Sequence, residues 1–166
     1  MKKNTSFLIL IVTALAITSL AFAAGPFGFS HPCFEFSLPS SFMTEDSPVI
    51  IFGPAEGDFR INVNFLVQKT DGKTLEEFTK LSQEQLKSFP ESKVIKEGYE
   101  TINGAKFYSV TATFKKETYV LKAKTAWAVT DGKAYVITYT ATEQTFDKYL
   151  KDAETMFSTF AIKAKK

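Results

Sequence analysis

The sequence predicts an α+β protein, in which an antiparallel β-sheet is flanked by helices. Three observations lead to this class. Apolar and polar residues alternate along residues 59–67, as in a half-buried strand. Asn103-Gly104 and Asp131-Gly132 are strong turn signals between β-rich segments. Residues 75–89 and 146–160 repeat apolar residues at helical spacing.

The first 23 residues resemble a secretory signal peptide. Lys2 and Lys3 precede an apolar run at 7–20, and Ala21-Phe22-Ala23 supplies small residues at the two positions that a signal peptidase reads. Cleavage is expected between Ala23 and Ala24. An uncleaved anchor is the alternative, but the apolar run is shorter than the roughly 20 residues that span a bilayer. The expected location is therefore periplasmic or extracellular.

Composition limits the possible functions. Removing Lys2 and Lys3 lowers the 20 basic residues to the number of acidic ones, 18, so a uniformly basic nucleic-acid binder is not expected. With 45% apolar and 14% aromatic residues, the chain has the means to build a core. Cys33 is the only cysteine, so no internal disulfide can form, and no lipobox surrounds it.

The first half of the chain predicts three strands and a helix. Residues 24–33 are expected to be an irregular lead-in, and strands are expected at 34–38, 49–52 and 59–67. Gly53-Pro54 should close the second of these strands. Thr74-Leu75-Glu76-Glu77 then forms a capping box at a helix start. The apolar arc of this helix contains Leu75, Phe78, Leu81, Leu86 and Phe89, and Pro90 should end it.

The second half predicts a meander and a closing helix. Strands are expected at 92–100, 105–114, 118–130 and 133–142, joined by the Asn103-Gly104 turn, a loop at 115–117 and the Asp131-Gly132 turn. The closing helix presents Phe146, Tyr149, Leu150, Ala153, Met156, Phe157 and Phe160 on one face. We expect a single domain over residues 34–162, followed by a basic tail at 163–166.

Four segments in this order carry a family resemblance. They are residues 36–42 (FSLPSSF), 102–107 (INGAKF), 132–139 (GKAYVITY) and the closing helix. Their order and spacing resemble the PsbP-like family, which comprises the photosystem II extrinsic subunit and bacterial relatives such as the DcrB-like envelope proteins. Phe42 stands where that family usually has Trp. The resemblance implies an α/β/α sandwich and a mostly non-enzymatic role.

The residues that carry catalysis are scarce. His31 is the only histidine and lies two residues from Cys33, too few ligands for a structural metal site. No nucleophile elbow, zinc-protease motif or phosphate-binding loop is present. Four carboxylates, those of Glu45, Asp46, Glu56 and Asp58, could form a weak Ca²⁺ site, but they lack a calcium-loop pattern and are better explained as a solvated loop. No cofactor or metal is expected.

One face of the meander contains the candidate partner-binding residues. Pairing Phe114 with Thr118 and Thr130 with Lys133 places Tyr108 opposite Lys124, and Lys124 opposite Tyr139, with Lys122 on the same face. The opposite face is uncharged and should be core beneath a helix. The simpler explanation of the mixed face is that lysine stems lie along an apolar surface with their ammonium groups in water. Tyrosines beside lysines could instead contact an anionic or extended partner.

Three hypotheses about function remain open at this point. The first is a non-catalytic exported domain that binds or helps assemble another cell-envelope or secreted component. The second is a carrier of a small apolar ligand between sheet and helix, because 17 Phe residues could line a cavity. The third is a hydrolase-type enzyme that uses tyrosine, lysine and carboxylates.

Overall fold

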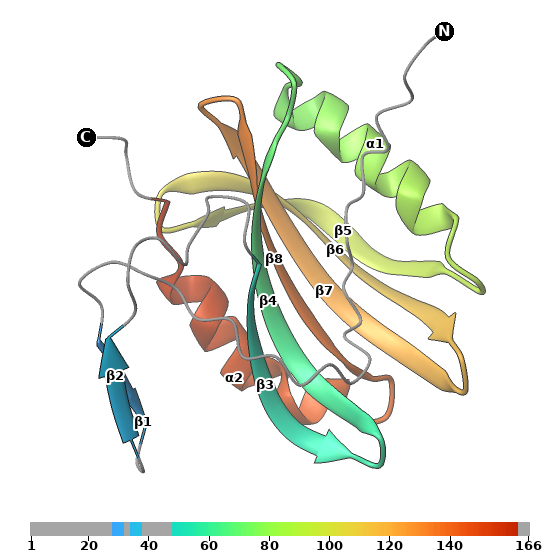
Figure 1. Ribbon diagram of the computed structural model, residues 1–166. Coiled ribbons are helices and arrows are strands. Elements are labelled where there is room, and N and C mark those ends of the chain that lie inside the picture. The colour runs from blue at the N-terminus through green and yellow to red at the C-terminus, as the bar shows by residue number, and fades with distance from the viewer. Residues whose placement is uncertain (1–27, 32–33, 38–47, 163–166) are drawn as a thin grey trace, which may run out of the picture.

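A computed structural model describes residues 28–31, 34–37 and 48–162. Six strands form one antiparallel sheet in the order β3-β4-β8-β7-β6-β5 (Figure 1). They are β3 (Val49–Glu56), β4 (Phe59–Lys69), β5 (Lys93–Ile102), β6 (Ala105–Lys116), β7 (Tyr119–Thr130) and β8 (Lys133–Thr142), with helices α1 (Leu75–Lys87) and α2 (Phe146–Thr159). The predicted α+β class is confirmed.

The N-terminal segment contains a small hairpin. Strand β1 (Gly28–His31) pairs antiparallel with β2 (Phe34–Ser37) in a separate two-stranded sheet. The expectation of an irregular lead-in over 24–33 is therefore wrong at residues 28–31, where pairing with the next strand supplies backbone partners that local composition does not reveal. The expected signal peptide, Cys33 and the basic tail lie outside the described residues.

The two helices cover opposite faces of the sheet. On β7, Trp127 belongs to the cluster that packs against α1, whereas its neighbours Ala126 and Ala128 belong to the cluster that packs against α2. The α1 cluster includes Phe78, Leu86, Val110, Ala112, Ala134 and Val136. The α2 cluster includes Ile137, Tyr139, Phe146, Ala153 and Phe157. The uncharged meander face expected beneath a helix is thus confirmed on β7 and β8.

Helix α1 begins at the expected capping box. The Glu77 amide donates to Thr74 Oγ1 at 3.3 Å, and the Thr74 amide donates to Glu77 Oε2 at 2.9 Å. The hydrogen bond from the Thr74 backbone amide, and after it the Thr74 side chain, lowers the pKa of Glu77, since both favour the charged carboxylate. Leu81 was expected on the buried arc, but it is exposed, because α1 contacts the sheet through a narrower stripe that contains Phe78 and Leu86.

Strand β3 continues beyond the expected stop at Gly53-Pro54. Its register with β4 shifts between Phe52 and Ala55, so a β-bulge accommodates the proline and the strand resumes to Glu56. The Glu56 carboxylate accepts hydrogen bonds from the hydroxyls of Thr142 (2.9 Å) and Thr145. Glu56 therefore joins the end of β3 to the end of β8 and the start of α2.

The face beneath α1 also contains buried polar side chains. Asn62 and Asn64 alternate with apolar residues on β4, yet both are buried. Asn64 Nδ2 donates to Asn62 Oδ1 at 3.4 Å, and Asn62 Nδ2 donates to the Arg60 backbone carbonyl at 3.1 Å. The polar residues of this alternating strand therefore do not face solvent, because both faces of β4 are buried here.

Candidate functional site

The register of β6 with β7 differs from the expected one by three residues. Tyr108 lies opposite Trp127, not Lys124. The register of β7 with β8 is as predicted, with Lys124 opposite Tyr139 and Lys122 opposite Ala141. Because three is odd, the shift moves Tyr108 to the other face of the sheet. The prediction that Tyr108 shares a face with Lys124 and Tyr139 is wrong.

The cause of the shift is the turn between these strands. We expected a three-residue loop over 115–117, but β6 runs on until Lys116 pairs with Tyr119. Glu117 adopts the left-handed conformation, with φ of 54°, in a two-residue turn. This register places Phe114 opposite Leu121 and thereby aligns two buried apolar side chains. Core packing outweighs the weak turn signal of a Glu-Thr pair.

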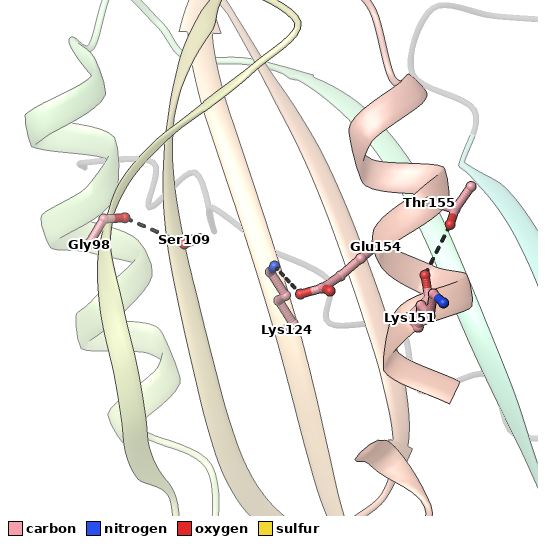
Figure 2. Close-up of polar contacts among 6 residues, drawn as sticks. All are labelled: Gly98, Ser109, Lys124, Lys151, Glu154 and Thr155. Atoms are coloured by element: carbon pink, nitrogen blue, oxygen red, sulfur yellow. Dashed lines mark hydrogen bonds and ion pairs between the residues drawn. The ribbon is translucent and has the colours of Figure 1, made fainter. Parts of the chain in front are cut away.

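Helix α2 lies over the lysines of β7. Figure 2 shows the contact between Lys124 and Glu154. Lys124 Nζ lies 3.1 Å from Glu154 Oε1 and 5.4 Å from the centroid of the Phe157 ring. Lys122 Nζ lies 3.0 Å from Asp147 Oδ1 and 4.5 Å from the Phe146 ring. The lysine side chains are only 16% and 17% exposed. Their stems therefore lie between sheet and helix, and their ammonium groups pair with α2 carboxylates at its margin.

Tyr139 lies in the core beneath the start of α2. It is 1% exposed, its hydroxyl donates to the Phe146 carbonyl at 2.9 Å, and its ring packs on Phe146 with centroids 4.8 Å apart. Burial, reinforced by the carboxylates of Glu56 and Asp147, raises the pKa of Tyr139 well above its ordinary value. The candidate row of tyrosines and lysines is therefore not an open face, because α2 covers its Tyr139 end.

Tyr108 instead belongs to an accessible aromatic arrangement, which we call the Tyr99 cluster: Gln83, Glu97, Tyr99, Lys106 and Tyr108. Tyr99 is 51% exposed, and its ring meets the Tyr108 ring edge to face, with centroids 5.0 Å apart. Lys106 Nζ lies 4.1 Å from the Tyr99 centroid. An exposed ring is thus held between a second ring and a cation.

The inner side of the Tyr99 cluster is anchored to α1 and the core. Gln83 Nε2 donates to Tyr108 Oη at 3.1 Å and to Glu97 Oε2 at 2.8 Å. Burial and the neighbouring Glu97 carboxylate raise the pKa of Tyr108. The Tyr108 ring then packs on Trp127, whose Nε1 donates to Thr79 Oγ1 at 2.9 Å. Tyr99 is therefore supported by a continuous row of rings from the surface to the core.

The sequence did contain a signal for this cluster. Asn103-Gly104 is the turn that was predicted, and it pairs Ile102 with Ala105. Counting outward from that pair places Tyr99 opposite Tyr108, as the structure shows. The candidate partner-binding residues were derived from the two later turns alone, so Tyr99 and Lys106 were not among them.

Residues beneath α1 line a small cavity. Its volume is about 30 Å³, room for a water molecule or two, and its lining includes Ser82, Thr125 and Trp127. Such a cavity is too small for an apolar metabolite. This cavity therefore gives no support to the carrier hypothesis.

Residues 28–31, 34–37 and 48–162 show neither a cluster of metal ligands nor a helix that could span a membrane. Within these ranges, no three His, Cys, Asp or Glu side chains gather as a metal site would require. Within the same ranges, no helix has the length and apolarity to cross a membrane.

Comparisons with known proteins reveal structural neighbours. No protein-family model and no curated protein sequence matches this chain. Among solved structures, PA94 from Pseudomonas aeruginosa, described as a putative regulator of unknown function, superposes with a TM-score of 0.66 at 14% identity. That match covers 84% of this chain and 98% of PA94.

Two further neighbours have a TM-score of 0.51 and 14% identity. LpqN, which is involved in cell envelope biogenesis of Mycobacterium tuberculosis, matches over 69% of this chain and 83% of its own. Cyanobacterial PsbP from Synechocystis sp. PCC 6803 matches over 90% of this chain and 99% of its own. The resemblance read from four short segments is thus confirmed at the level of architecture: the chain has the fold of PsbP-like proteins.

Proposed function

We propose that this chain is a non-catalytic exported domain that binds, or helps assemble, another component of the cell envelope or of the secreted protein set. The sequence supports export through its n-region, apolar run and Ala-x-Ala site. The fold neighbour LpqN takes part in envelope biogenesis, which fits such a role.

The Tyr99 cluster is the observation that carries this proposal. Protein-binding sites concentrate their energy in tyrosine, tryptophan and arginine side chains that sit on well-packed supports. Tyr99 has this character, because its exposed ring rests on Tyr108 and Lys106. The surface beside Tyr99 carries both signs of charge, since Lys106 Nζ lies 3.9 Å from Glu76 Oε1. A protein partner with mixed charges of its own matches this surface better than a uniformly anionic polymer does.

Affinity capture from the cell envelope of the native host tests the proposal. Tagged protein, exported by its own N-terminal segment, should retain a reproducible partner, and Tyr99→Ala should reduce its recovery at least about tenfold, as expected of a hot-spot residue. Lys106→Ala should reduce recovery less. Lys148→Ala is the matched control, because Lys148 Nζ also lies over a tyrosine ring, 4.8 Å from the centroid of Tyr149, but on α2.

The outcomes separate clearly. Equal recovery with Tyr99→Ala and with Lys148→Ala would remove the Tyr99 cluster from the proposal. N-terminal sequencing of the exported protein checks the export step, and a chain that begins at Ala24 is expected. A mature chain that still carries Lys2 and Lys3 would mean anchoring in place of release.

A further inference from the structure

The two outer strands of the sheet differ in how they are protected. A free edge exposes unpaired amide and carbonyl groups, and proteins usually guard it with charges or bulges. Strand β5 carries Lys93, Lys96 and Glu97 and has a bulge between Val94 and Lys96. Strand β3, at the opposite end of the sheet (Figure 1), has no charged residue before Glu56. Strand β3 also bulges, but only beyond Phe52, where its register with β4 shifts. The stretch before that bulge therefore has neither a charge nor a bulge to oppose strand addition.

The unguarded part of β3 is short and has defined ends. It is the five-residue stretch from Val49 to Gly53, which we call the β3 edge. Pro48 and Pro54, which lack an amide hydrogen, flank it on either side. Ile51 and Phe52 are 44% and 46% exposed. Among the described residues, only β4 pairs with this strand.

We propose that the β3 edge pairs with the same edge of a second copy of this chain, antiparallel, about a two-fold axis through Ile51. Ile51 is the midpoint between the two prolines, so this register uses the whole stretch and sets Pro48 opposite Pro54 of the partner subunit. The proposal does not depend on the proposed function or on the Tyr99 cluster.

The side chains are self-complementary in this register. Antiparallel neighbours point to the same face, and the two-fold places Ile50 opposite Phe52 of the partner subunit, twice. A β-branched side chain facing an aromatic one is a favourable cross-strand pair. Ile51 meets Ile51 of the partner subunit on the other face, the one that α2 covers. No charged residue of the β3 edge faces its own copy, because the stretch contains none.

Closure of the assembly follows from the contrast between the edges. Pairing β3 with β5 of another copy would be head to tail and could continue without end. The charges of β5 oppose that arrangement, because β3 offers no opposite charge before Glu56. Pairing β3 with β3 uses the β3 edges of both copies at once, so association stops at a dimer with one continuous sheet that ends in β5 on either side.

Sedimentation equilibrium of the purified protein tests the proposal. The weight-average mass should rise from that of a monomer toward twice that value as concentration increases from about 1 µM to about 500 µM, the range expected for a short edge contact. Ile51→Lys and Ile51→Glu should each stay monomeric, because each places like charges directly opposite one another. An equimolar mixture of these two variants should regain the dimer.

The matched control is Ile95→Lys on β5, where the side chain is 52% exposed on the other edge of the sheet. It should dimerise like the unmodified protein. Recovery of the dimer in the Lys and Glu mixture excludes misfolding as the reason for their monomeric state. The proposal is overturned if the unmodified protein stays monomeric throughout, if Ile51→Lys dimerises normally, or if the β3 edge captures only a strand of a different protein.

Discussion

The hydroxyl of Tyr139 on β8 donates a hydrogen bond to the carbonyl of Phe146, the first residue of α2, at 2.9 Å. The two residues lie seven positions apart, and the chain between them makes the turn from sheet to helix. The same two rings pack against each other. This contact orients α2 so that its Asp147 and Glu154 carboxylates reach Lys122 and Lys124.

Tyr139→Phe should lower the free energy of unfolding by about 0.5–1.5 kcal/mol, the usual net value of one hydrogen bond. The phenyl ring keeps its packing on Phe146, so the loss isolates the hydroxyl. Urea denaturation at neutral pH measures it. Tyr149→Phe, which changes a partly buried ring on α2, serves as the comparison. An equal loss of unfolding free energy in both variants would mean that the Tyr139 hydrogen bond adds no particular stability.

Alkaline pH should destabilise the protein through the same hydroxyl. Its pKa is raised in the folded state from the ordinary value of 10.0, so between those two values only the unfolded chain releases the proton. The stabilising contribution is therefore complete below about pH 10 and is lost as pH rises toward the folded-state pKa. The free energy of unfolding, measured by denaturation from about pH 8 to about pH 11, should fall less steeply with pH for Tyr139→Phe than for the unmodified protein. Parallel curves for the two proteins would contradict the assignment.

Phe157→Ala should cost about 3–5 kcal/mol, because its ring is buried between α2 and the sheet. Lys151→Ala, at an exposed position of the same helix, should cost less than about 0.5 kcal/mol. Chemical denaturation of both variants checks the difference. Small and similar losses would mean that α2 is not docked on the sheet.

Glu117→Asn should raise the free energy of unfolding by about 0.5–1 kcal/mol, because asparagine tolerates the left-handed conformation that Glu117 adopts. Glu117→Gln removes the same charge without that tolerance and should leave stability unchanged. Thermal unfolding of the two variants distinguishes conformation from charge. A gain with both would assign the effect to charge and leave the two-residue turn unsupported.

Local signals in the sequence determined much of the fold. Asp131-Gly132 defined the β7–β8 register, because a two-residue turn with two left-handed residues fits few side chains and those two fit it well. The capping box located the start of α1, because its two hydrogen bonds form between residues three apart. Such signals can be read directly since all the participating atoms lie within a few residues.

Only the tertiary structure decided what depends on distant segments. The β6–β7 register places Phe114 opposite Leu121 in the core, and no residue of the turn indicates this register. Asn62 and Asn64 alternate as surface residues would, yet the fold buries them. Lys122, Lys124 and Tyr139 share the face that was predicted, but α2, which begins after the last strand, covers it. Periodicity indicates which residues share a face, whereas packing between segments far apart in the chain decides which face remains open to a partner.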